Sequence, residues 1–179
     1  MGFSTSLTFI VLILPISALS QNVEVIFASE FYNISLDNKV TILQLENETD
    51  YKSRLTQLFG QPVEEDCVTD MFGKSCEFIY SGFELSFAFD NQLFDLSLTS
   101  AQSFLRYGPY QLKPGMTLSE LQVIFPDAYN DRRLLNLGNE TRNIINVYVG
   151  HSGSDTVITF FYNPTTNKVV EVNINYELI

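Results

Sequence analysis

The second half of the chain repeats the residue pattern of its first half. A segment at 51–62 carries apolar residues at helical spacing and ends in Gly-Gln-Pro, and a segment at 117–128 has the same spacing and also reaches a proline. The corresponding apolar positions are Leu55, Leu58 and Phe59 in the first segment and Leu121, Ile124 and Phe125 in the second. Three strand-like runs follow each segment. This repetition predicts that both halves build the same unit, a helix followed by an antiparallel meander.

The strand-like runs have one apolar and one polar face. They lie at 77–82, 83–90 and 93–100 in the first half and at 146–150, 156–163 and 169–178 in the second. In the run at 83–90, large apolar residues alternate with Glu84 and Ser86, which indicates a sheet covered on one side only. Both helices are too short to be stable alone, so each must lie on the sheet. We therefore predict an α+β fold in which residues 21–106 and 107–179 form two modules that share one antiparallel sheet, with the helices on one face.

The starts of the two predicted helices carry residues that are typical of helix caps. Thr49 or Asp50 can cap the first helix, and Thr117 with Glu120 forms a capping-box pattern at the second.

The segment at 23–47 is rich in β-branched and aromatic residues and is interrupted by Asp37-Asn38. This composition predicts two strands that are joined by a turn at the Asp-Asn pair.

The first twenty residues have the properties of a secretory signal peptide. Residues 7–16 are almost wholly apolar, and Ala18-Leu19-Ser20 offers small residues where signal peptidase cuts, with Gln21 as the first mature residue. Residues 1–6 contain no Lys or Arg, which departs from the usual pattern, and the alternative is a buried N-terminal segment. We expect residues 1–20 to be a signal peptide and the protein to be secreted or periplasmic.

The two cysteines agree with export. An isolated pair such as Cys67 and Cys76 in an exported protein indicates a disulfide, here closing a loop between the first helix and the strand after it. Four acidic residues lie in or beside this loop: Glu64, Glu65, Asp66 and Asp70. Because Ca²⁺ takes several oxygen ligands from one flexible loop, a calcium site is an alternative to a solvated acidic loop. The sequence leaves both open.

The net charge of −11 restricts the partners that this chain can bind. It results from 21 acidic and 10 basic residues, and such a chain repels phosphate backbones and anionic lipid surfaces. We expect no nucleic-acid partner and no membrane insertion after signal removal, and we expect a protein partner with a basic surface. The oligomeric state and the use of three Asn-x-Ser/Thr patterns stay open.

No group of residues in the sequence is typical of catalysis. The single histidine, His151, lies in a turn-like Gly-His-Ser-Gly-Ser-Asp segment, where neighbouring side chains rarely converge on one point. One histidine and two cysteines do not supply a closed zinc site, and no cofactor motif is present. We therefore expect a protein that is not an enzyme and that holds no cofactor or metal.

The chain resembles the fold family of the β-lactamase inhibitory protein and related small envelope modules. The resemblance rests on the turn and helix start "LKPGMTLSEL", on the helix ends "FGQP" and "FPDA", and on Cys67 and Cys76 between helix and sheet. It covers essentially the whole mature chain, although the second half has no cysteine pair. It implies a binding module and not a particular target.

These observations predict an exported, non-enzymatic binding module, in its sharper form an inhibitor of another protein, that uses its open sheet face and turns. The alternative is a structural or assembly factor of the cell envelope. The candidate partner-binding residues on the polar strand positions are Glu84, Ser86, Asp95, Glu171 and Asn173, with Ser97 and Asn175 beside them.

The first prediction concerns processing. Mass spectrometry of the exported protein should show a chain that begins at Gln21 and weighs about 2 Da less than its reduced form, because Cys67 and Cys76 are joined. Free thiols in protein recovered without reductant would contradict the disulfide and weaken the inference of export.

Overall fold

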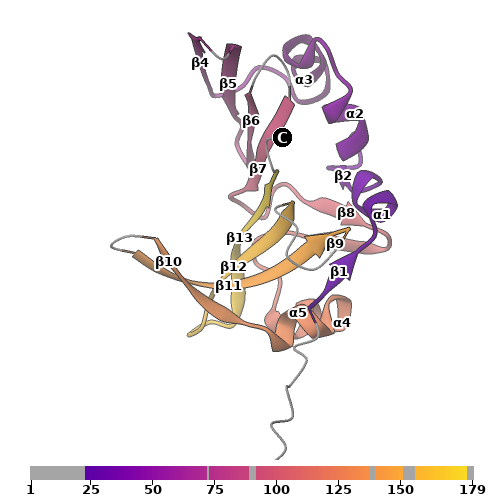
Figure 1. The fold of residues 1–179 in the computed structure, drawn as a ribbon, viewed down its shortest axis with the longest axis vertical. Helices are drawn as coiled ribbons and strands as arrows, with labels where there is room; N and C mark the ends of the chain where they lie inside the picture. Colours follow the sequence, from indigo (N-terminus) through magenta and orange to yellow (C-terminus); the bar gives the residue numbers. More distant parts are fainter. Residues whose placement is uncertain (1–22, 72, 89–91, 138–139, 151–155, 177–179) are drawn as a thin grey trace, which may run out of the picture.

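The fold is α+β, with a large mixed sheet and few helices (Figure 1). The computed structural model describes residues 23–71, 73–88, 92–137, 140–150 and 156–176. The large sheet contains β1 (Val25–Ile26), β4 (Glu64–Asp70), β5 (Gly73–Ile79), β6 (Phe83–Ala88), β7 (Gln92–Leu98), β10 (Arg133–Leu137), β11 (Glu140–Val149), β12 (Val157–Asn163) and β13 (Lys168–Asn175). A small sheet contains β2 (Ser35–Leu36), β3 (Val40–Thr41), β8 (Leu105–Tyr107) and β9 (Tyr110–Leu112). The helices are α1 (Ala28–Tyr32), α2 (Ile42–Glu46), α3 (Tyr51–Phe59), α4 (Leu118–Ile124) and α5 (Pro126–Asn130).

The large sheet joins the two halves of the chain at its centre, through β7 and β13, and again at one end, through β1 and β11. Its order is β1-β11-β12-β13-β7-β6-β5-β4, and β10 also pairs with β11. At the centre, β7 and β13 are antiparallel, with Leu98 opposite Val172 and Asp95 opposite Asn175. The expectation of a wholly antiparallel sheet is wrong at one end, because β1 pairs in parallel with β11.

Each half has helical structure followed by antiparallel strands. Helix α3 precedes β4 to β7, and α4 with α5 precedes β10 to β13. Both halves therefore contain one strand more than the sequence predicted, namely β4 and β10. This order is what the repeat hypothesis requires, and the repeat itself stays a prediction.

The expected loop around Cys67 is strand β4. Cys67 lies directly opposite Cys76 of β5, and the two form a disulfide with Cα atoms 4.1 Å apart. The disulfide is confirmed, but it joins two paired strands and does not close an irregular loop. Acidic residues are rare in strands, yet here the backbone ladder with β5 decides the conformation.

The segment at 23–47 contains less strand than predicted. The turn is confirmed, since Asp37 and Asn38 both have positive φ angles, of 50° and 57°. The flanking residues, however, form only short strands next to helices α1 and α2. Helix α2 is started by a capping box in which Thr41 Oγ1 accepts from the Gln44 amide at 3.2 Å and Gln44 Oε1 accepts from the Thr41 amide at 2.9 Å. These local hydrogen bonds outweigh the β propensity of the segment.

The predicted caps of the two main helices are confirmed. Asp50, the second of the two residues considered, accepts from the Ser53 amide at 3.2 Å at the start of α3. At α4, Thr117 and Glu120 form the capping box, with the Thr117 amide donating to Glu120 Oε2 at 2.7 Å. Pro126 follows directly but begins α5, because a proline is tolerated at the first position of a helix.

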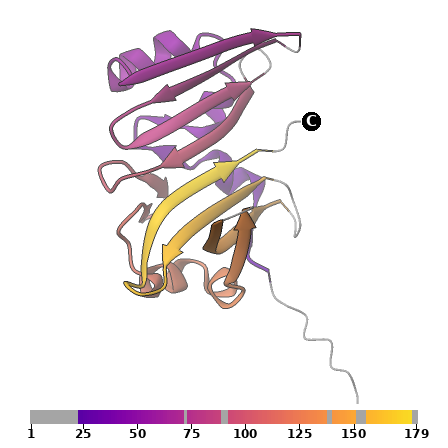
Figure 2. The same cartoon turned by 90° about the vertical axis from the view of Figure 1, so that its left-hand side faces the viewer.

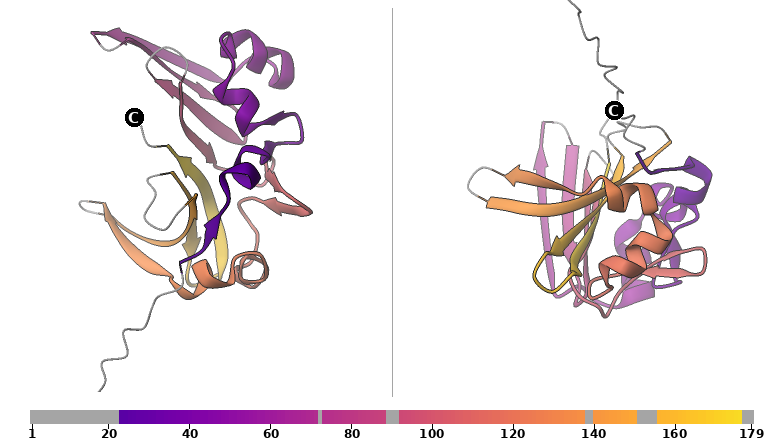
Figure 3. Two further views of the ribbon diagram at one scale, coloured as in Figure 1. Left: turned by 45° about the vertical axis from the view of Figure 1, so that its right-hand side comes forward. Right: turned by 90° about the horizontal axis from the view of Figure 1, so that it is seen from below.

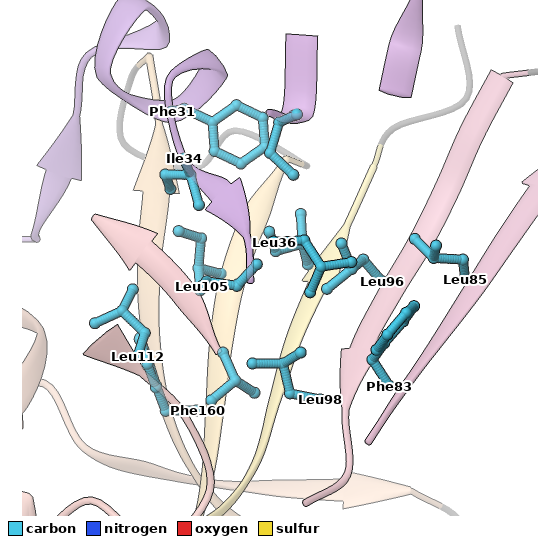
Figure 4. Close-up of a cluster of buried hydrophobic side chains, with 14 of the residues drawn as sticks. Phe31, Ile34, Leu36, Phe83, Leu85, Leu96, Leu98, Leu105, Leu112 and Phe160 are labelled. Atoms are coloured by element: carbon cyan, nitrogen blue, oxygen red, sulfur yellow. The ribbon is translucent and has the colours of Figure 1, made fainter. Parts of the chain in front are cut away.

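The helices and the small sheet cover one face of the large sheet (Figures 1 and 3). Figure 4 shows Leu36 and Leu105 of the small sheet in the same buried cluster as Leu96 of β7. At one end of this layer, the ring of Tyr51 on α3 stacks on Phe87 at 4.2 Å. Figure 2 looks onto the opposite face, with the strands in front and the helices behind. The core is therefore on one side of the sheet, as the alternation predicted. No helix among the described residues is long and apolar enough to cross a membrane.

The second prediction concerns this core. Leu55 on α3 and Leu121 on α4 are both fully buried, so Leu55→Ala and Leu121→Ala should each lower the free energy of unfolding by about 2 to 4 kcal/mol in a urea titration. Val123→Ala is the matched control, since Val123 lies on α4 and is 74% exposed, and it should change stability by less than about 0.5 kcal/mol. A neutral result at Leu55 or Leu121 would contradict the placement of that helix.

Candidate functional site

Two rows of polar residues cross the uncovered face of the large sheet. In the first row, neighbouring strands place these residues opposite one another: Asp66, Glu77, Ser86, Asp95 and Asn175. The second row contains Glu84, Ser97, Asn173, Thr159 and Asn146. The structure therefore brings four of the predicted residues, Glu84, Ser86, Asp95 and Asn173, onto adjacent strands of one face. The fifth, Glu171, lies on β13 two residues before Asn173.

A hydrogen-bonded cluster lies where β7 meets β13. Asn173 Nδ2 donates to Asp95 Oδ1 at 2.7 Å and to Ser97 Oγ at 2.6 Å, and Ser97 Oγ donates to Asp95 Oδ2 at 3.1 Å. Asn175 Nδ2 in turn donates to Asn173 Oδ1. Asn173 and Ser97 are each only 8% exposed, so these two residues hold the strand junction together. The more accessible groups of this region are Glu84, Ser86, Asp95 and Asn175.

Negative charge accumulates around this cluster. Burial raises the pKa of Asp95 above its ordinary value, although the hydrogen bonds from Asn173 and Ser97 oppose the shift. Burial also raises the pKa of Glu84, and the nearby carboxylates of Glu77, Glu171 and Asp95 raise it further. Both carboxyl groups therefore lie in surroundings that disfavour their ionised forms.

Arg142 on β11 partly neutralises one end of the face. Its Nη1 lies 3.0 Å from Glu171 Oε2, and its Nε lies 2.9 Å from Glu140 Oε1. Glu171 is thus already paired within the chain, which makes it a weaker partner-binding candidate than Glu84. This arginine could not be singled out from the sequence, because its place beside Glu171 depends on the register between β11, β12 and β13.

Shallow depressions lie at both ends of the polar face. One, of about 480 Å³, is lined by acidic and apolar side chains: Asp66, Val68, Asp70, Glu77, Ser86, Ala88 and Phe94, among others. The other, of about 410 Å³, surrounds the Arg142–Glu171 pair. A larger depression of about 700 Å³ lies elsewhere, between the β8–β9 hairpin and α4, and contains none of the predicted residues.

The calcium hypothesis for the acidic segment loses its structural basis. Because residues 64–70 form a strand, their side chains alternate between two faces instead of converging on one point. Glu65, for example, pairs with Lys52 on α3 at 2.6 Å, whereas Asp66 lies in the row with Glu77 on the uncovered face. Within the described parts of the chain, no group of three or more His, Cys, Asp or Glu residues is placed to hold a metal ion. His151 lies outside the described residues.

The third prediction concerns the pH dependence of stability. The raised pKa of Glu84 means that the folded state binds its proton more tightly than the unfolded state does. The resulting stabilisation is present below the unfolded-state pKa and is lost as pH rises through the raised folded-state value. Glu84→Gln removes this loss, so the variant should gain roughly 0.5 kcal/mol on the wild type between about pH 3 and about pH 7.

Glu120→Gln is the matched comparison for this measurement. Hydrogen bonds from Thr117 lower the pKa of Glu120, so its stabilising effect is present at neutral pH and is lost as pH falls. Its replacement should therefore shift the urea midpoint with the opposite pH trend. The same trend in both variants would contradict the electrostatic account of the sheet face.

Comparison with known proteins does not identify a family. No family model and no curated protein matches the chain. Among solved structures, it is similar to an extracellular SCP-domain protein from Bacillus anthracis, with 13% identity and a TM-score of 0.49 over 79% of this chain and 47% of that one. It is also similar to a cysteine-rich secretory protein from Staphylococcus aureus (11%, TM-score 0.41, 70% of this chain and 43% of that one). A third structure is a DUF4309 family protein from Bacillus subtilis (15%, TM-score 0.48, 83% and 91%). The chain thus spans less than half the length of the first two proteins.

Proposed function

We propose that this chain is an exported, non-enzymatic binding module whose uncovered sheet face receives a basic surface of another protein. The observation that carries the proposal is the first row, in which Asp66 on β4 lies directly opposite Glu77 on β5 and Asp95 follows on β7, two strands beyond Glu77. Like charges opposite each other on neighbouring strands lower stability. A partner that brings Lys or Arg side chains to this row would relieve the repulsion between the carboxylates. This relief would contribute to the free energy of binding.

The character of the face favours a reversible complex. Interfaces that are permanently buried are more apolar than the rest of a protein surface. Here the centre of the face is an amide, a hydroxyl and one carboxylate that satisfy one another within the chain. The alternative, a permanent packing of this face in an envelope assembly, would desolvate the acidic side chains of the face for the lifetime of the complex. An inhibitor of another protein is the sharper form of the proposal.

Two further features support the exported, non-enzymatic part of the proposal. The disulfide partner Cys67 lies on a solvent-exposed strand, where a bridge persists only in an oxidising compartment. Asp95, the most enclosed carboxyl group of the face, accepts hydrogen bonds from Asn173 and Ser97 on both of its oxygens. Both oxygens of Asp95 are thus occupied within the chain, whereas a general base needs an oxygen directed at a substrate proton.

The predicted repeat would give the site a simple origin. The polar face is centred on the pair β7–β13, each the last strand that its half contributes to the large sheet. Two copies of one unit that meet through their last strands would form such a shared face at their junction.

The fourth prediction tests this proposal. The wild-type protein and a Glu84→Lys variant should be used as baits on the exported fraction, and each recovered partner should be purified and titrated against both. Glu84→Lys should weaken binding about tenfold or more, and raising the salt concentration should slow association with the wild type. Asp131→Lys, a charge reversal after α5, is the control and should bind like the wild type. Equal affinity for the wild type and Glu84→Lys would reject the face as the binding site.

A further inference from the structure

Strand β4 contributes nothing to the hydrophobic core. All seven of its residues are exposed, and none belongs to the buried cluster. It lies at the end of the large sheet with β5 as its neighbour, and its second edge pairs with no other strand among the described residues. Figure 2 shows it as the outermost strand, at the top of the view. A strand of this kind would fray if backbone pairing alone held it in place.

Two side-chain links hold β4 in place. The disulfide joins Cys67, the central residue of β4, to Cys76, which is 3% exposed and belongs to the core. Glu65 is tied to Lys52 of α3. Both cysteines of the sequence are used at this one position. The bridge therefore fixes a strand that the core does not need, and the result is a rigid, open sheet edge.

The backbone alternation shows which amides face the open edge. The short Cα–Cα distance of 4.1 Å between Cys67 and Cys76 identifies them as a non-hydrogen-bonded pair. On β5 the alternation agrees, because the Tyr80 amide donates to Phe83 O at 2.9 Å, toward β6. The amides of Phe78 and Cys76, two and four residues before Tyr80, then also point to β6 and not to β4. It follows that the amides of Glu65, Cys67 and Thr69 point away from β5 and toward the open edge.

The side chains beside this edge indicate what can pair with it. On the uncovered face, Asp66 lies next to Val68, which is 59% exposed, and the same depression contains Phe94, which is 40% exposed. An added strand would place every second side chain over this face. Basic residues with long aliphatic stems fit there, because the stem can cover Val68 and Phe94 while the charge reaches Asp66.

We propose that β4 receives an extended, basic segment of a partner protein as an additional strand of the large sheet. The proposal rests on the proposed function and specifies how its partner binds. Main-chain hydrogen bonds to β4 would supply the attachment, and alternating basic side chains would supply the specificity. A second copy of this chain is not expected at this edge through its own β4, because two acidic edges would repel each other.

The probe for this proposal is the acetylated and amidated peptide Lys-Val-Lys-Val-Lys-Val-Lys, whose affinity is measured by isothermal titration calorimetry on the mature chain with its disulfide intact. The control peptide has the same sequence with a fully N-methylated backbone, so that it keeps the charge but donates no main-chain hydrogen bonds. We expect the control to bind about tenfold more weakly or worse. Equal affinity of the two peptides would overturn the proposal, because binding would then depend on charge alone.

A pair of protein variants tests the edge itself. Thr69→Pro removes an amide that faces the open edge and leaves the ladder to β5 intact, whereas Thr69→Ala keeps this amide. Thr69→Pro should weaken peptide binding about tenfold relative to Thr69→Ala, and the two variants should have the same urea midpoint of unfolding. Reduction of the disulfide in wild-type protein should also weaken binding, because β4 is then no longer fixed. Peptide affinities within twofold for the two variants would reject β4 as the docking edge.

The two proposals can fail separately. A purified partner that is weakened by Glu84→Lys but binds equally to Thr69→Pro and Thr69→Ala would support the sheet face and overturn the strand addition. A partner whose binding is weakened by Thr69→Pro and not by Glu84→Lys would support the strand addition and overturn the sheet face as the binding site. Size-exclusion chromatography without peptide gives a further outcome, since self-association that Thr69→Pro abolishes would assign the edge to a second copy and overturn the proposed partner class.

Discussion

The pairing of β7 with β13 is the contact on which the rest of the structure depends. It joins the two halves of the chain, and its register is fixed from both sides. On the covered side, Leu96 and Ile174 are fully buried, and a slip of one residue would turn them toward solvent. On the uncovered side, the amide of Asn173 finds its acceptors, Asp95 and Ser97, in this register. A buried polar group that is satisfied in a single arrangement specifies that arrangement.

The same junction couples the stability of the fold to the chemistry of its open face. Asp95 helps to hold the strands together through Asn173, yet burial raises its pKa and so works against its charge. Asp66 and Glu77 extend the row of acidic side chains outward onto β4 and β5, where they lie directly opposite each other. The sheet therefore carries an electrostatic cost, concentrated on the face that the helices leave uncovered.

The sequence was most informative where local chemistry and tertiary structure agree. The alternation around Glu84 and Ser86 predicted the two-faced sheet, and the Thr117–Glu120 capping box predicted the start of α4. The prediction of strands failed at Thr41, whose capping box with Gln44 starts a helix in a segment rich in strand-forming residues. Prediction from the sequence failed again at 64–70, because acidic residues were read as a loop although pairing with β5 makes them a strand. The Asp66–Glu77 opposition could not be predicted, since it depends on the register between two strands and not on the composition of either.

Strand β1 has a consequence for the order in which the chain can be completed. Val25 and Ile26 pair with Tyr148 and Val149, and the Gly150 amide donates to Ile26 O at 2.9 Å. Val25 and Ile26 thus find their strand partners only once residues 148–150 are present. Contacts of such long sequence separation form late and slow folding. A chain that emerges N-terminus first cannot pair β1 early. Its N-terminal segment therefore stays accessible to other proteins until β11 has emerged.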